Sequence, residues 1–337
     1  MTANKAIYVE LNMRTDLETL WRRTQVPELH ASWDLRFSEI VYVPRPDEAR
    51  PQRFLYRTRI GFGLSIAGTG ETRSAGAAAG PRLSTLVFDS DHPWSLIRRG
   101  AGYWRYVPHA DGTVTFLTRY DYATRFGGVG RCFDRLVFRP LFGWATAWSF
   151  DRLRLWLEED RRPRETLERA LLHYGCLLAL IGVWIYQGAV PKLLHASGAE
   201  LELLRDAGMT EQVAVAALRA LGGAEALLGL LAWPLRRRKS LYVVQAVLLL
   251  LLAAAALTIR PGLAAEPFNP VALTLPLLGL CLAAGLTRLR LPDARRCMRA
   301  PRADGRLHHA CIVVDGSADH DQAASDPCAA DGTGGAS

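Results

Sequence analysis

Four long apolar segments dominate the second half of the chain, and none of them has a polar face. They cover residues 171–190, 213–235, 241–259 and 270–286. A helix needs about 20 apolar residues to cross a hydrocarbon core of about 30 Å. A helix that is apolar all round does not suit the surface of a soluble bundle. We therefore predict four transmembrane helices in a membrane domain at residues 171–290.

In the first half of the chain, hydrophobic and polar residues alternate as they do in β-strands. A strand pattern at residues 6–13 precedes the helix pattern TDLETLWRR, and further strand patterns cover residues 35–43, 53–60, 64–72, 83–89, 96–107 and 114–124. An amphipathic stretch at residues 130–159 predicts a long closing helix. The order of elements predicts an α+β domain at residues 1–160. A basic linker at 161–170 joins it to the membrane domain, and residues 291–337 have the composition of a disordered tail.

Lysine and arginine are distributed unevenly over the segments that flank the apolar stretches. Fifteen of them lie before the first stretch, between the second and third, and after the fourth, against three in the other two loops. Because positive loops stay in the cytoplasm, we predict a multi-pass protein of the bacterial inner membrane with both termini cytoplasmic. The first residues lack the apolar core of a secretory signal peptide.

The charge and cysteine content exclude several classes of protein. Residues 1–159 carry 22 Lys and Arg against 17 Asp and Glu without a basic run, so we predict no nucleic-acid partner. The six cysteines show no C-x-x-C spacing, which argues against a disulfide framework. The tail residues His308, His309, Cys311, His320 and Cys328 fit no standard zinc spacing, so we predict no metal site.

The opening AIYVELNM-x-TDLETLW, the run of strands and the closing FDRLRLWLEE resemble the START-like (SRPBCC) superfamily over roughly residues 4–159. The resemblance implies a helix-grip fold, in which a curved antiparallel sheet holds the long helix. It also implies an apolar cavity between sheet and helix for a lipid-like or polycyclic ligand. Some members of the superfamily catalyse reactions in this cavity.

Alternating aromatic residues on the predicted strands are our candidates for the cavity wall, although ordinary core packing is the better explanation for any single one of them. The candidates are Phe54, Tyr56, Trp104, Tyr106, Phe116, Tyr120, Tyr122 and, on the helix, Trp148. No Walker A, G-x-S-x-G or H-E-x-x-H motif is present. Catalytic residues stay unassigned, and the sequence leaves open whether the protein is an enzyme.

The segment Phe133–Trp156 interleaves aromatic residues with arginines. Such a pattern fits a helix at a membrane interface or the gripped helix of the predicted fold. We favour the gripped helix for most of these residues, with the arginines turned to anionic lipid.

Three segments of the second half, VWIYQGAVPKLL, LGGAEALLGL and PFNPVALTL, are similar to the DoxX-like membrane family over roughly residues 168–290. The resemblance implies a four-helix bundle. Glu225 lies near the middle of the second apolar stretch, where a carboxylate costs about 2.5–3.5 kcal/mol to insert. We predict an intramembrane polar site in which Glu225 is protonated or pairs with Tyr186, Gln187 or His173. A structural hydrogen bond between helices explains this site as well as proton or quinone chemistry does. Lys192 is expected to reach the lipid headgroups.

Together these features predict a membrane-tethered protein that binds a lipid, an isoprenoid quinone or a polycyclic metabolite, without a resident cofactor. Its partners would be the lipid bilayer and this hydrophobic molecule, and its oligomeric state stays open. The alternatives are a cyclase- or dehydratase-like enzyme, a subunit of a quinone-linked oxidoreductase with a membrane redox partner, and a non-catalytic structural partner of another membrane enzyme.

Overall fold

The computed structural model describes residues 6–47, 50–61, 63–76, 80–195, 198–267 and 269–301. In its first half, one strand, two helices and six further strands precede a long helix. These elements are β1 (Ile7–Arg14), α1 (Leu17–Gln25), α2 (Pro27–Trp33), β2 (Glu39–Tyr42), β3 (Gln52–Gly61), β4 (Leu64–Gly76), β5 (Arg82–Asp89), β6 (Ile97–Pro108), β7 (Thr113–Thr124), α3 (Gly127–Phe133), the π-helical turn η1 (Asp134–Phe138) and α4 (Arg139–Glu159).

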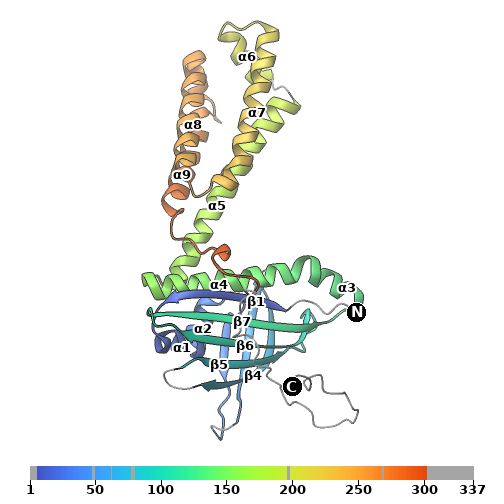
Figure 1. Cartoon of the computed structure of the whole chain (residues 1–337). Helices are drawn as coiled ribbons and strands as arrows, with labels where there is room; N and C mark the ends of the chain where they lie inside the picture. The colour runs from blue at the N-terminus through green and yellow to red at the C-terminus, as the bar shows by residue number, and fades with distance from the viewer. Residues whose placement is uncertain are drawn as a thin grey trace, which may run out of the picture. The chain divides into compact units, whose positions relative to one another are not determined.

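The seven strands form one antiparallel sheet in the order β1-β7-β6-β5-β4-β3-β2. Each strand from β2 to β7 pairs with its neighbour in sequence, whereas β1 pairs with β7 in the register Ile7 opposite Tyr120. Helices α1 and α2 connect the two edges of the sheet, and α4 packs along β1 (Figure 1). This arrangement is the helix-grip fold that the START-like resemblance implies.

The core of this domain lies between the sheet and α4. Phe150 of α4 stacks on Phe116 of β7 with ring centroids 4.5 Å apart, and Phe116 in turn stacks on Tyr106 at 4.9 Å. All three side chains are fully buried. Burying one large aromatic side chain contributes about 1.5–3 kcal/mol, so this aromatic stack is a main support of the fold.

The arginines of α4 do not face lipid, in contrast to the interpretation from sequence. Arg152 and Arg154 are 3% and 9% exposed. Arg152 donates hydrogen bonds to the main-chain oxygens of Trp33 and Pro163 at 3.1 and 2.7 Å, and Arg154 donates to Asp151 at 2.6 Å. Buried charges need such partners. Main-chain oxygens at the end of α2 and at Pro163 supply them for Arg152, and the Asp151 carboxylate supplies one for Arg154.

The second half consists of helices. They are α5 (Pro163–Gln187), the π-helical turn η2 (Gly188–Leu194), α6 (Gly198–Asp206), α7 (Glu211–Leu235), α8 (Lys239–Ile259), the short 3-10 helix η3 (Pro261–Ala265) and α9 (Pro270–Thr287). Among the described residues, four helical stretches are long and apolar enough to cross a membrane: 163–194, 211–235, 239–259 and 270–287. Helix α5 packs against α7 and α9, and α8 packs against α9.

The first of these helices begins earlier than the sequence predicts. Residues 163–170, assigned to a linker, are the first turns of α5. Proline is favoured at the first position of a helix, and Arg164 pairs with Glu168 one turn later at 2.8 Å. The charged residues therefore extend the spanning helix instead of separating it from the soluble domain.

The prediction of a disordered tail is wrong for residues 291–300, which include the short 3-10 helix η4 (Ala294–Arg296). Leu291, Ala294 and Cys297 are buried in the core of the helix-grip domain. Glu10 and Met298 exchange main-chain hydrogen bonds at 2.9 and 3.0 Å. This segment docks because apolar residues recur at every third position, 291, 294 and 297. The overall composition of the tail does not show this pattern. Residues 302–337, with the histidines and cysteines considered as metal ligands, lie outside the described residues.

Candidate functional site

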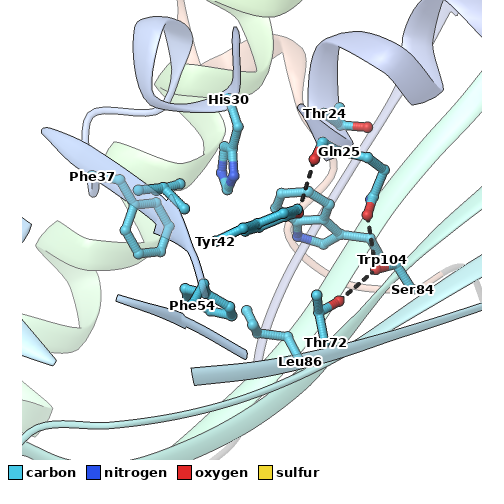
Figure 2. Close-up of a pocket in the computed structure, with 11 residues that line it drawn as sticks. Thr24, Gln25, His30, Phe37, Tyr42, Phe54, Thr72, Ser84, Leu86 and Trp104 are labelled. Carbon is cyan, nitrogen blue, oxygen red and sulfur yellow. Dashed lines mark hydrogen bonds between the residues drawn. The ribbon is translucent and has the colours of Figure 1, made fainter. Parts of the chain in front are cut away.

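A cavity of about 420 Å³, counting space open to solvent, lies between α1, α2 and strands β2 to β6. Its wall contains the apolar side chains of Phe37, Ile40, Tyr42, Phe54, Leu86 and Trp104, and the polar ones of Thr24, Gln25, His30, Thr72 and Ser84. Figure 2 shows the ring of His30 pointing into the space between Phe37, Tyr42 and Trp104. A mainly apolar cavity with a few polar groups is the usual form of a small-molecule site.

His30 is held by its neighbours on both sides. Its ring meets the ring of Trp104 edge-on, with centroids 4.8 Å apart, and the ring of Phe37 at 5.1 Å. Its Nε2 atom lies 3.1 Å from Oδ2 of Asp34. Asp34 is 1% exposed and also accepts two hydrogen bonds from the Arg36 guanidinium, at 2.9 and 2.6 Å. The cavity therefore has a histidine that is oriented by a buried carboxylate.

The electrostatics of this group fix its protonation. Burial raises the cost of charging Asp34, but the attraction of Arg36 and the hydrogen bonds from His30 and Arg36 outweigh it, so the pKa of Asp34 lies well below its usual range. Burial also lowers the pKa of His30, which the hydrogen bond to Asp34 opposes only in part. His30 is therefore neutral at pH 7. Because a carboxylate only accepts hydrogen bonds, Nε2 carries the proton and Nδ1 is the acceptor.

The other polar side chains of the wall bind one another. Thr72 and Ser84 lie 3.1 Å apart through their hydroxyl oxygens, and Ser84 donates to the Gln25 side chain at 3.4 Å (Figure 2). Gln25 also donates to the Tyr106 hydroxyl at 2.9 Å, and Thr24 shares that hydroxyl at 2.8 Å. This network satisfies the polar groups on the sheet side of the cavity.

Two of the eight aromatic candidates from the sequence line this cavity, namely Phe54 and Trp104. Tyr56 lies beside it, with its ring 5.6 Å from that of Phe37. Tyr106 is behind the wall and joins the polar network. The other four belong to the core between the sheet and the helical segment 127–159: Phe116 stacks on Phe150, Tyr120 bonds Thr146 at 2.7 Å, Tyr122 bonds Asp134 at 2.7 Å, and Trp148 is buried in the same cluster.

The sequence analysis did not find His30, Asp34 and Arg36. His30 and Asp34 are four residues apart at the end of α2, the spacing that places two side chains on the same face of a helix. That spacing is a signal in the sequence, but a histidine next to an acid resembles an ordinary surface pair until the aromatic residues of distant strands are known to surround it.

A second polar group lies within the helical bundle. Lys192 of η2 is 6% exposed, and its Nζ atom lies 3.0 Å from a carboxylate oxygen of Glu225 in α7, which is 5% exposed. The same ammonium lies 3.0 Å from Glu200 of α6. Lys192 therefore does not reach the lipid headgroups as expected, but joins three helical segments through two carboxylates.

The partner of Glu225 differs from those predicted. Tyr186 is 59% exposed, and His173 bonds the main-chain oxygen of Ala284 at 3.1 Å. Gln187 contributes its main-chain oxygen, which accepts a hydrogen bond from Lys192 at 3.3 Å.

Glycines bring η2 and α7 together at this place. A Cβ atom on Gly188 would lie 2.4 Å from the main-chain oxygen of Gly222, and one on Gly222 would lie 2.6 Å from Cβ of Lys192. Small residues permit such close packing of helices in membranes, so the two glycines let the ion pair form inside the bundle.

Comparison with known proteins places the chain among membrane proteins. It is 41% identical over 296 residues to the uncharacterized membrane protein YndG of Bacillus subtilis (strain 168), a match that covers 88% of this chain and 97% of YndG. Residues 181–282 match the sequence profile of the DoxX-like family, which confirms the resemblance found for the bundle.

Similar solved structures include a START superfamily protein from Mycobacterium smegmatis, with 16% identity, coverage of 47% of this chain and 100% of that one, and a TM-score of 0.34. Another is the Zhui aromatase/cyclase from Streptomyces sp. R1128, with 11% identity, coverage of 44% and 96%, and a TM-score of 0.34. On the strength of the match along nearly its whole length, the chain belongs to the family of membrane proteins that includes YndG, with a DoxX-like region in its helical bundle.

Proposed function

We propose that this protein binds a hydrophobic small molecule in the cavity of its helix-grip domain and holds that molecule next to the membrane. The observation that carries the proposal is the cavity itself, with apolar walls around one oriented histidine.

His30 defines the polar end of the ligand. Its Nδ1 atom makes no hydrogen bond to the part of the chain that the structure describes. A neutral histidine whose Nε2 proton is committed to Asp34 offers Nδ1 as an acceptor. The ligand that fits this site is an apolar or polycyclic molecule, such as an isoprenoid quinol or a lipid, with a hydroxyl or amine group at one end.

The bundle would hold this domain at the cytoplasmic face of the bacterial inner membrane. Two sets of contacts support this topology: Arg152 bonds the first residue of α5, and Asp151 accepts a hydrogen bond from the main-chain N–H of Asp293, beyond α9. The start of α5 and the segment after α9 thus both contact the helix-grip domain. An even number of membrane crossings would place these two ends of the bundle on the same side. The excess of positive residues in the flanking segments favours the cytoplasm for that side.

Photo-crosslinking from two neighbouring residues tests the proposal. Phe54 lines the cavity and is 5% exposed, whereas Leu55, next to it on β3, is 51% exposed on the opposite face. We would introduce a benzophenone amino acid at each position in the full chain, irradiate cells and identify the adducts by mass spectrometry. The proposal predicts one enriched small-molecule adduct at position 54 and none of that mass at position 55. Identical adducts at both positions, or none, would contradict it.

Acid–base catalysis in the same cavity is the second candidate function, and the contact of His30 with Asp34 favours it. A neutral histidine supported by a carboxylate can accept a proton from a bound molecule. The compound identified by crosslinking would be incubated in its free form with the purified full chain. Catalysis predicts that a product of different mass then accumulates. That product would disappear in the His30→Gln variant.

A further inference from the structure

An exposed row of apolar side chains follows the helix that leads into the core of the helix-grip domain. The row consists of Val129, Phe133, Leu136, Val137, Leu141 and Trp144, on α3, η1 and the first turns of α4. Each of these side chains is at least 45% exposed, and Val129 and Leu136 reach 80% and 70%. Soluble surfaces rarely collect so many large apolar residues in one place.

The spacing of the row shows that it forms the outer face of a helical segment. The inner face of that segment packs against the sheet. Successive members are three or four residues apart, apart from the adjacent pair Leu136 and Val137. On the inner side, Phe138 and Phe142 pack against the ring of Tyr122, at 6.1 and 6.0 Å. In the described part of its own domain the row is therefore exposed, apart from the contact of the Trp144 ring with that of Trp148 at 6.2 Å, while the opposite face of the same helical segment completes the core.

The charges around the row are of one sign. Arg131 and Arg135 are exposed beside it. The one acidic residue between positions 126 and 144 is Asp134, which is fully buried and bonds Tyr122 and Arg139. An exposed apolar face flanked by arginines, with a tryptophan at one end, is the composition of helices that lie in the lipid–water interface.

We propose that this row is inserted into the interface of the bilayer that the chain's own helices cross. The row lies on the helical segment that leads to the first spanning helix, which begins at Pro163, four residues after α4 ends at Glu159, so the chain itself tethers the row to the bilayer. The arginines would meet anionic headgroups while the apolar side chains enter the acyl boundary. The proposal concerns how the domain docks on lipid and does not depend on what the cavity binds.

Spin labels on the full chain in bilayers test it. In a background with Cys132, Cys311 and Cys328 replaced by serine, single cysteines would be introduced at Val129, at Leu136 and, as control, at Asp111 in the turn between β6 and β7. Cys176, Cys281 and Cys297 are buried, and labelling of the background variant reports how far they react. The protein would be placed in nanodiscs of phosphatidylethanolamine and phosphatidylglycerol. Accessibility to oxygen, which concentrates in lipid, would be compared with accessibility to a water-soluble nickel chelate.

We expect the labels at 129 and 136 to be several-fold more accessible to oxygen than to the chelate, and the label at 111 to show the reverse. Equal accessibility to the chelate at all three positions would overturn the proposal. Protection from both reagents, with spin–spin broadening at 129 and 136, would also overturn it, because the row would then be covered by a second copy of the chain.

Discussion

His30 and Asp34 meet at the wall of the cavity, with Nε2 of the imidazole 3.1 Å from Oδ2 of the carboxylate. The contact joins the last turn of α2 to the residue that ends it. One partner faces the cavity and the other is fully enclosed, so the buried acid determines which histidine nitrogen is left for a ligand. The central proposal, a hydrophobic ligand with a polar end at His30, depends on this pair.

The first prediction concerns pH. Burial lowers the pKa of His30, so the folded state keeps it neutral while the unfolded chain takes up a proton below about pH 6.5. Because the unfolded state then binds more protons, the free energy of unfolding falls as the pH is lowered. We expect the Tm of the helix-grip domain to decrease between pH 7 and pH 5, and this slope to be smaller in His30→Gln. Circular dichroism of both full-length proteins at several pH values measures it.

His109 provides the matched control, since it lies at the turn after β6 and outside the cavity. The His109→Gln variant should keep the slope of the unchanged protein. An equal loss of slope in both variants would show that the pH dependence does not come from the cavity.

The buried pair of Asp34 and Arg36 gives a second prediction. Replacing Asp34 by Asn leaves the Arg36 charge buried without its counter-ion, which we expect to lower the free energy of unfolding by about 3 kcal/mol or more. In the double variant Asp34→Asn, Arg36→Met the loss should be smaller than the sum of the two single losses. Denaturant titration of the four proteins measures this coupling.

The same cycle on Arg53 and Glu71 serves as comparison, because this pair also joins an arginine to an acid but is more than half exposed on both sides. Exposed pairs contribute at most about 1 kcal/mol. A coupling at Asp34 and Arg36 as small as that of the exposed pair would contradict the assigned role of the buried one.

A third prediction follows from the ion pair in the bundle. The Lys192→Met variant leaves Glu225 inside the bundle without its cation, so we expect it to be less stable than the double variant Lys192→Met, Glu225→Gln. Lys239 is exposed at the start of α8, so Lys239→Met should have little effect. Thermal unfolding in detergent, followed by helix content, ranks the three variants. Equal stability of the single and double variants would show that the pair is not formed.

Some parts of the molecule could be predicted from sequence because their signals are local. Strands β3 to β7 and the four apolar helices follow from the pattern of hydrophobic residues, and each lies within a few residues of its predicted place except α5, which begins eight residues earlier. The contacts of Lys192 with Glu225, and of His30 with Trp104, join residues that are distant in sequence. Such pairs are determined by how helices and strands pack against one another. The spacing of hydrophobic residues within one element does not contain this information. For the same reason the docked segment around Cys297 resembled a disordered tail.

That segment gives a fourth prediction. Cys297 is 6% exposed, and its burial raises the pKa of the thiol to about 12, so it should react slowly with alkylating reagents. Asp151 holds the segment by accepting a hydrogen bond from the main-chain N–H of Asp293 at 2.8 Å. Loss of a charged acceptor costs about 1.5 kcal/mol, so we expect Asp151→Asn to accelerate alkylation of Cys297 by about tenfold. Mass spectrometry of the labelled peptide measures this, with exposed Cys132 as internal reference. An unchanged ratio would contradict the docking role of Asp151.

The most direct measurement is the content of the cavity in the purified protein. Small molecules would be extracted with organic solvent from the full chain and from two variants, and then quantified by mass spectrometry. Leu86→Trp fills the cavity from β5, whereas Leu55→Trp adds the same side chain on the exposed face of β3. Our account predicts one enriched hydrophobic molecule with a hydroxyl or amine group in the unchanged protein and in Leu55→Trp, and its loss from Leu86→Trp. The same bulk phospholipid in all three samples, with no other enriched molecule, would contradict it.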